Sequence, residues 1–272
     1  MGYSIWKKLR FGLNAAGRGR QSVVPEGNAM QDDVRADQIA PINPLPGVVW
    51  LLALPMIALE IAFSLADAGV IGGPQAVGWR IAAIEGYGVF PEYWRQNWAA
   101  GAVDMPLLRR FLSFAFIHGS ATQALFGIAM TMALGKFVGE VFKGWAVGVV
   151  FLGSGAVGAL VYAYAVPNQP LFGAFPGVYG LIGAFSFLIW VKLAGTGVNQ
   201  LRAFSLIGAL MVFQAIFGAF YTLLPMLMPS MGEVGHDWSW VADLPGFAAG
   251  FLLSFVVSPG GFVRVRERIR GR

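Results

Sequence analysis

Three carboxylates interrupt long apolar stretches of the sequence, and they are the first residues that could do chemistry. Glu60, Glu140 and Asp243 each lie within or at the end of such a stretch. A carboxylate in apolar surroundings is costly unless it accepts a proton, pairs with a cation or receives hydrogen bonds. We expect Glu60 to bond to a neighbouring helix or reach an aqueous interface. We expect Glu140 to pair with Lys136, one helical turn before it.

Asp243 lies in the stretch "WSWVADLPGFAAGFLL". Pro245 follows two positions later, and because proline fits only the first turn of an unkinked helix, Asp243 could cap that helix by accepting a backbone N–H. Gly246 and Gly250 follow with the spacing GxxxG, which places both on the helix face of Asp243. We predict that this face packs closely against another helix.

A second glycine-patterned stretch, "LFGAFPGVYGLIGAF", covers residues 171–185. Gly173, Gly177 and Gly180 give it a small-residue face, which we predict packs against the Gly246 and Gly250 face. The helix opens with Phe175, where a hydroxyl would have indicated a nucleophile, and a phenyl ring can neither attack a carbonyl nor give up a proton.

Other nucleophiles do not fit a site at Phe175. Ser186 lies ~16 Å away along a helix that rises 1.5 Å per residue. An aspartyl mechanism would need a second carboxylate beside Asp243, and the sequence offers no pairing that we can defend. We therefore predict no catalytic residues in this region.

Composition shows where these residues lie. The 272 residues are 57% hydrophobic and 12% charged, which is more apolar than the core of a soluble domain requires. The chain is therefore a membrane protein. It has no cysteine, which excludes disulfides, thiol nucleophiles and thiolate metal sites, and its 2 histidines, His118 and His236, lead us to predict no metal and no cofactor.

Apolar stretches long enough to cross ~30 Å of hydrocarbon predict six membrane spans. They cover about residues 47–66, 108–134, 144–165, 173–191, 203–228 and 240–257. The connection 67–106 is rich in aromatic residues, so we expect it to lie in the headgroup layer as short helices.

The Lys and Arg residues set the orientation. With six spans both termini share one side, and all Lys and Arg except Arg80, Arg95, Arg109 and Arg110 fall on that side. The termini are therefore predicted to be cytoplasmic, and the net charge of +5 reflects topology rather than nucleic-acid binding. We see no internal repeat, which disfavours an inverted-repeat transporter.

With the spans in place, the sequence resembles the rhomboid family of intramembrane serine proteases. Residues 242–250 read Ala-Asp-x-x-Gly-x-x-x-Gly, whereas the family has Ala-His-x-x-Gly-x-x-x-Gly, so Asp243 stands at the position of the catalytic histidine. The family's Gly-x-Ser-Gly, with a tyrosine four residues after the serine, is matched by residues 173–176 and Tyr179. Phe175 therefore stands at the position of the serine nucleophile.

The second span supports the resemblance. "RRFLSFAFIHGSATQALFGIAMTMALG" is similar to the family's Trp-Arg-x-x-Thr-x-x-Phe-x-His-x-x-x-x-His-x-x-x-Asn, with Arg110 as its arginine and His118 as its first histidine. The second histidine and the asparagine, which line the oxyanion hole in the family, fall on Gln123 and Gly127, and the tryptophan is replaced by Arg109. The resemblance covers most of residues 47–257.

The resemblance implies an all-α, polytopic bundle of six transmembrane helices. Because nucleophile, base and oxyanion residues are missing together while the packing glycines remain, we expect an inactive member, a pseudoprotease of the bacterial inner membrane. It would bind transmembrane segments of partner proteins within the lipid bilayer, either handling clients or serving as an accessory subunit, with no small-molecule substrate. The family admits substrates beside the second and fifth spans, where ordinary lipid-facing aromatics or partner contacts explain Phe213, Phe217, Phe220 and Tyr221 equally well.

Two alternatives stay open. One is an active rhomboid-type protease with atypical residues, and the other is a proton- or cation-linked transporter that uses Glu60 and Asp243. In each case we expect a partly disordered cytoplasmic segment at 1–45, a membrane domain at 46–258 that includes the loop 67–106, and a basic cytoplasmic tail at 259–272.

Overall fold

The computed structural model describes residues 45–194, 196–227 and 238–259, except for the side chains of residues 218, 219 and 221–227. The chain divides into Met1–Pro44 and Leu45–Arg272, and every described residue belongs to the second unit. The predictions for residues 1–44 and 260–272, for His236 and for the side chain of Tyr221 lie outside the described residues.

The described residues form an all-α structure whose only β pairing is the isolated antiparallel bridge between Val89 and Leu171. Its long helices are α3 (Gly47–Asp67), α7 (Ala121–Gly139), α8 (Gly144–Ala165), α9 (Phe175–Leu193), α10 (Ser205–Leu227) and α11 (Trp240–Val257). Among the described residues, six segments are long and apolar enough to cross a membrane. Five of them lie in α3, α7, α8, α9 and α11, and the sixth, Gln200–Phe217, begins before α10 and continues into it. The predicted fold class, an all-α polytopic membrane protein, is confirmed.

The second span differs from its prediction, which began at residue 108. The chain there forms α6 (Met105–Ser113) and the 3₁₀ helix η2 (Phe114–Phe116), and α7 begins only at Ala121. Ser120 caps α7 by accepting a hydrogen bond from the Gln123 N–H at 3.2 Å. The prediction was wrong because the apolar residues before the break, from Phe111 to Ile117, extend the hydropathy signal of the helix, although the polar residues His118 and Ser120 mark the break itself.

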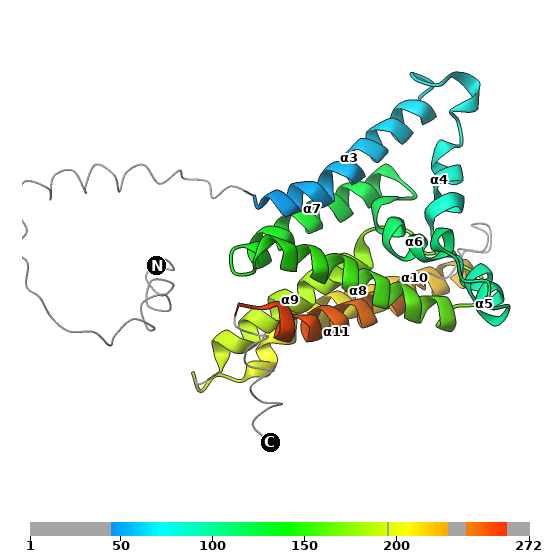
Figure 1. Ribbon diagram of the computed structural model, residues 1–272. Helices are drawn as coiled ribbons and strands as arrows, with labels where there is room; N and C mark the ends of the chain where they lie inside the picture. Colours follow the sequence, from blue (N-terminus) through cyan, green and yellow to red (C-terminus); the bar gives the residue numbers. More distant parts are fainter. Residues whose placement is uncertain (1–44, 195, 228–237, 260–272) are drawn as a thin grey trace, which may run out of the picture. The chain divides into compact units, whose positions relative to one another are not determined.

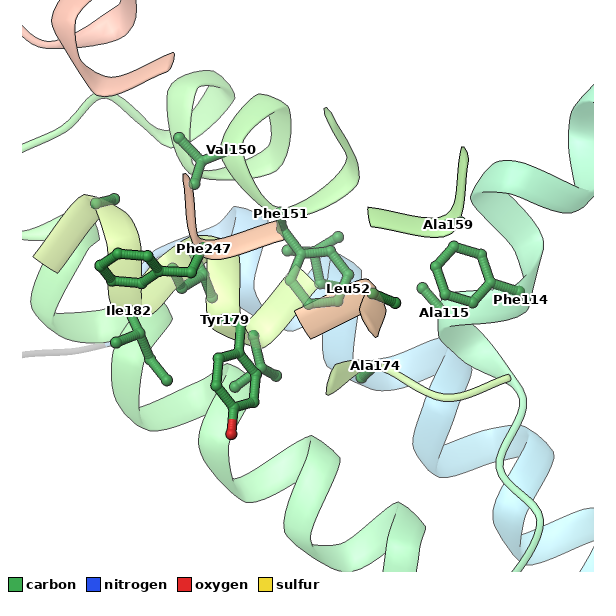
Figure 2. Packing of buried hydrophobic residues seen from close by; sticks show 14 of the residues in the cluster. Leu52, Phe114, Ala115, Val150, Phe151, Ala159, Ala174, Tyr179, Ile182 and Phe247 are labelled. Atoms are coloured by element: carbon green, nitrogen blue, oxygen red, sulfur yellow. The ribbon is translucent and has the colours of Figure 1, made fainter. Parts of the chain in front are cut away.

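Helices α8, α9 and α11 form the centre of the bundle (Figure 1). Helix α9 packs most extensively against α11, and α8 contacts both, while α3 packs against α7. Figure 2 shows part of the buried apolar cluster, in which Phe151 of α8, Tyr179 of α9 and Phe247 of α11 are labelled. Helix α10 contacts α9 and the 3₁₀ helix η3 (Gln200–Phe204), and its span has the smallest buried share of the six.

Glycines bring α9 and α11 to backbone contact. A Cβ at Gly250 would overlap the carbonyl oxygen of Gly180, and a Cβ at Gly246 would lie 2.5 Å from the carbonyl oxygen of Pro176. In return, a Cβ at Gly183 would overlap the carbonyl oxygen of Phe247. Such close approach allows the dispersion and Cα–H···O contacts that hold helices together in lipid, where no hydrophobic force acts between them.

The glycines of the second glycine-patterned stretch also contact helices other than α11. The hydrogens of Gly177 and Gly180 face α8, where an added Cβ would meet Phe151 and Ser154. Gly173 precedes α9 and has a left-handed φ of +106°, and a Cβ there would lie 2.8 Å from Nε2 of Gln123 in α7. The structure therefore places Gly173 at a turn rather than on the α9 face that meets α11.

The connection between α3 and α6 contains short helices, as predicted. They are η1 (Gly73–Gln75), α4 (Trp79–Tyr87) and α5 (Pro91–Ala99). Trp79, Tyr87 and Trp98 are exposed, whereas Trp94 is buried against Phe111 and its ring also contacts those of Trp98 and Tyr164. The location of this connection in the headgroup layer stays a prediction.

Arg95 attaches α5 to the end of α8. Its guanidinium donates to the carbonyl oxygens of Ala163 and Val166 at 2.9 and 2.8 Å, and to that of Pro167 at 2.5 Å. The last carbonyls of a helix lack partners within the helix and form its negative end. A cation therefore stabilises this terminus and holds the connection against the bundle.

Candidate functional site

The candidate site lies where the chain turns into α9. The Gly173 N–H donates to the carbonyl oxygen of Phe114 at 2.9 Å, and the left-handed φ of Gly173 redirects the chain so that α9 starts at Phe175. The Phe175 side chain is half-buried and packs against the apolar cluster. The first residue of α9 thus contributes apolar contacts and no hydroxyl.

His118 and Gln123 both bond to the backbone around this turn. The Ala174 N–H donates to Nε2 of His118 at 3.4 Å. Oε1 of Gln123 accepts from the Gly119 N–H at 2.8 Å, and its Nε2 donates to the carbonyl oxygen of Phe172 at 3.5 Å. The side chains of the retained family position His118 and of the degenerate oxyanion position Gln123 are therefore both engaged with the local backbone.

Gly127 provides the space that His118 occupies. A Cβ at Gly127 would lie 2.8 Å from Nε2 of His118 and 3.4 Å from the Cβ of Ala174. The structure therefore brings together three predicted positions, 118, 123 and 127, beside the turn that leads to Phe175. A larger residue at position 127 would displace the imidazole.

His118 is uncharged at neutral pH. Its side chain is 1% exposed, and this burial lowers the pKa of His118 to about 4, with Arg80 acting in the same direction and Glu60 opposing it. Because Nε2 accepts a hydrogen bond from Ala174, the proton of the neutral ring resides on Nδ1. A neutral imidazole is compatible with its apolar surroundings.

This burial predicts a loss of stability in acid. Between pH 6.5 and about 4 the unfolded chain protonates His118 while the folded chain does not, so the free energy of unfolding falls as the pH falls through this window. The expected loss attributable to His118 is about 3 kcal/mol. Unfolding in detergent should be measured at pH 7 and pH 4 for the wild type and for His118→Gln, which retains an acceptor but does not titrate. Equal pH dependence of the two proteins would contradict the assignment.

Asp243 lies inside the first turn of α11. The helix begins at Trp240 after the flanking residue Ser239, so the expectation that Asp243 caps it is wrong. The Asp243 N–H itself donates to the carbonyl oxygen of Ser239 at 3.1 Å. The position of Pro245 suggested a helix that starts after Asp243, but the helix starts three residues before it, at Trp240. Oδ2 of Asp243 accepts from Nε2 of Gln214 in α10 at 3.1 Å, and Asp243 is 1% exposed.

Glu60 bonds to a neighbouring helix, as expected, and its partner is Arg80 of α4. The guanidinium donates to the two carboxylate oxygens of Glu60 at 2.8 and 2.9 Å, and to the carbonyl oxygen of His118 at 3.0 Å. It also donates to Asp67 at 3.4 Å and lies 5.3 Å from the ring centroid of Phe63. We refer to Glu60, Asp67, Arg80 and the His118 carbonyl as the Arg80 cluster.

In the sequence, Arg80 stands out only as one of the charges of the connection 67–106. The signal that could have identified its role is the carboxylate of Glu60, because a carboxylate inside an apolar span requires a cation or several donors. The two carboxylates of the transporter hypothesis have different partners, since Glu60 binds Arg80 of α4 and Asp243 binds Gln214 of α10.

The remaining family positions and aromatics also have defined places. Arg110 donates to the carbonyl oxygens of Glu85 and Gly88 at 2.8 Å each, and Tyr179 is buried in α9. On α10 three of the predicted contact residues are exposed, and the rings of the first two are 4.4 Å apart: Phe213, Phe217 and Phe220.

Comparisons with known proteins identify the family of this chain. Residues 107–260 match the family model described as the Rhomboid domain. Mouse Rhomboid-related protein 2 is 27% identical over 152 residues, which cover 54% of this chain and 47% of that protein. Mouse Rhomboid-related protein 3 is 26% identical over 148 residues, which cover 54% of this chain and 36% of that protein. The matched segment thus spans less than half of each relative. The family match extends over more than half of the chain and includes α7 to α11 with the turn into α9, so this protein belongs to the rhomboid family.

Proposed function

We propose that this protein is a non-proteolytic rhomboid that binds transmembrane segments of other membrane proteins. The observation that carries the proposal is Phe175, which starts α9 where the family motif has its serine. Acyl transfer requires a hydroxyl or thiol nucleophile, a base within hydrogen-bond reach, and donors aimed at the developing oxyanion. A half-buried phenyl ring provides none of these.

The polar side chains at three of the predicted site positions support the same proposal. His118 accepts from the backbone of Ala174, Gln123 is bonded to Gly119 and Phe172, and Asp243 accepts from Gln214. Each of these polar side chains therefore joins two parts of the bundle. Activating a water or a substrate carbonyl would require breaking one of these hydrogen bonds first.

The surface of α10 supports binding of transmembrane segments. Its described side chains expose a continuous apolar strip: Val212, Phe213, Ile216, Phe217 and Phe220. Aromatic and branched side chains offer large contact areas to another helix. The proposal places client handling, or the role of an accessory subunit, on this strip beside α10.

The proposal also includes topology and location. The distribution of Lys and Arg places residues 1–45 and the basic tail 259–272 on the cytoplasmic side of a bacterial inner membrane, with the membrane domain at 46–258 between them. Proteins of this kind would meet their partners laterally, within the bilayer.

We expect the purified full chain in proteoliposomes to bind a fluorescent single-span helix and to leave it uncut. The double variant Phe213→Ala and Phe217→Ala should weaken binding about tenfold, because it removes two exposed rings from the strip. The matched control is Trp145→Ala, which removes an exposed ring from α8, away from the second and fifth spans. Binding is read by energy transfer in the membrane.

Two results would contradict the proposal. One is the absence of binding at any accessible helix density. The other is cleavage of the helix that is abolished by His118→Ala or by Asp243→Ala, because this dependence would identify an active hydrolase with atypical residues.

A further inference from the structure

The contact between α10 and α11 contains a pair of polar side chains within otherwise apolar helices. Nε2 of Gln214 donates to Oδ2 of Asp243 at 3.1 Å. Around this pair, the exposed side chains Phe213 and Phe217 lie on the outer side of α10, and Leu210 packs inward against the core. Because α10 has the smallest buried share of the six spans, the pair lies beside the helix that is least enclosed by the bundle.

The Gln214 amide uses only its nitrogen in this contact. Its Oε1 is buried and receives no hydrogen bond from any described residue. An unsatisfied carbonyl oxygen is strongly unfavourable in hydrocarbon, where no water can replace the missing donor. A donor from another molecule could reach this buried oxygen if α10 moves away from α11, and α10 belongs to the span with the smallest buried share of the six.

The chemistry of the pair defines its ligand. Asp243 places a carboxyl group in a site that is 1% exposed, directly beside the free acceptor of Gln214. A Lys ammonium has three N–H donors and no acceptor, so one group could reach Oε1 of Gln214 and the Asp243 carboxyl together. It also complements the charge of a carboxylate, which a neutral donor such as Asn does not.

We propose that Gln214 and Asp243 form a recognition site for a transmembrane helix that carries a lysine at the depth of this pair. The site lies one turn inside the N-terminal end of α11, so the lysine belongs about one turn inside the matching end of the partner helix. This inference rests on the proposed function and names the class of partner that it selects. The apolar strip of α10 contributes contact area for the partner helix, and the polar pair contributes the specificity for a helix with a lysine.

The test uses the full chain in proteoliposomes with two labelled single-span helices. They are Leu/Ala-based and differ only at the matched position, which is Lys in one and Met in the other, two unbranched side chains of similar length. We expect the Lys helix to bind about tenfold more tightly than the Met helix, which is the affinity difference that one charge-assisted hydrogen bond provides. Asp243→Asn and Gln214→Leu should each lower this ratio below about threefold.

The matched control is Thr131→Val, which removes a buried hydroxyl that bonds within α7, and it should keep the full ratio. A photoreactive group next to the lysine gives a second readout in the unmodified protein, independent of how the variants fold. Cross-links should fall on α10 and α11, and cross-links confined to other helices would overturn the inference.

The outcomes separate the two proposals. Equal affinity for the Lys and Met helices, with binding still weakened by the Phe213→Ala and Phe217→Ala double variant, would overturn the lysine site and leave the proposed function standing. A preference for Lys that persists in Asp243→Asn combined with Gln214→Leu would also overturn it. Absence of binding by either helix would overturn both proposals.

Discussion

Gly250→Ala is expected to destabilise the protein by about 3 kcal/mol, at the upper end for overpacking a well-packed core. The added methyl group would overlap the carbonyl oxygen and Cα of Gly180, and these backbone atoms cannot move without displacing α9. The effect should appear as a lower unfolding midpoint in a detergent titration. Helices α9 and α11 would have to separate, so the loss should extend to the whole bundle.

Gly208→Ala is the matched control for that substitution. Gly208 lies in α10, and a Cβ there would meet nothing within 4 Å. Alanine favours the helical conformation over glycine, so this variant should be as stable as the wild type or slightly more stable. If Gly250→Ala and Gly208→Ala had the same unfolding midpoint, close packing of α9 against α11 would not be what stabilises the centre of the bundle.

Arg80→Ala is expected to destabilise the protein by a similar amount, about 3 kcal/mol, because it leaves a mostly buried carboxylate without its cation. The side chains of Arg80 and Glu60 are 11% and 14% exposed, so little water is available to replace the lost hydrogen bonds. The His118 carbonyl would lose its donor as well. The Arg80 cluster joins α3, α4 and the turn before α7, so we expect the connection between α3 and α6 to loosen.

Hydrogen exchange and unfolding in detergent would measure this effect. Arg109→Ala is the control, because Arg109 is exposed and its guanidinium lies 5.0 Å from the ring centroid of Tyr87, a contact expected to contribute about 0.5 kcal/mol. Adding Glu60→Gln to Arg80→Ala should recover part of the loss, since it removes the unpaired charge. Equal stability of the Arg80 and Arg109 variants would show that the Arg80 cluster contributes little.

The spans were predictable because they depend mainly on hydropathy and length. The predicted range 144–165 coincides with α8, and 240–257 coincides with α11. The start of α7 was not predictable in this way, because apolar residues lie on both sides of the break and its position depends on the capping hydrogen bond of Ser120. Glycine spacing indicated close packing, but it could not assign Gly177 to α8 and Gly250 to α9.

Polar partners were harder to predict than helices. The pairing of Glu60 with Arg80 joins residues 20 positions apart, and that of Gln214 with Asp243 joins residues 29 positions apart. A buried carboxylate indicates that a partner exists, yet only the fold identifies it. The polar contacts at the turn into α9 were equally hard to predict, because they also join distant parts of the sequence. Gln123 of α7 bonds to Phe172, and His118, just before α7, bonds to Ala174.

Two features of this bundle differ from those that a catalytic cavity requires. The centre of the bundle is packed to backbone contact through Gly246, Gly250 and Gly183, and the polar groups beside α9 bond to one another or to the backbone. A catalytic cavity requires unoccupied donors and room for water. The proposed function requires no such cavity, because binding takes place on the outer face of α10 while the centre of the bundle stays closely packed.

The mass of a single-span helix recovered from proteoliposomes shows whether this protein cuts a transmembrane segment. After incubation with the full chain, beside a parallel sample containing an active serine rhomboid, mass spectrometry would report whether the peptide backbone was cut. The helix bound to this protein should be recovered whole, while the parallel sample yields two fragments. Fragments generated by this protein, and lost when His118 or Asp243 is replaced by alanine, would contradict a non-proteolytic function.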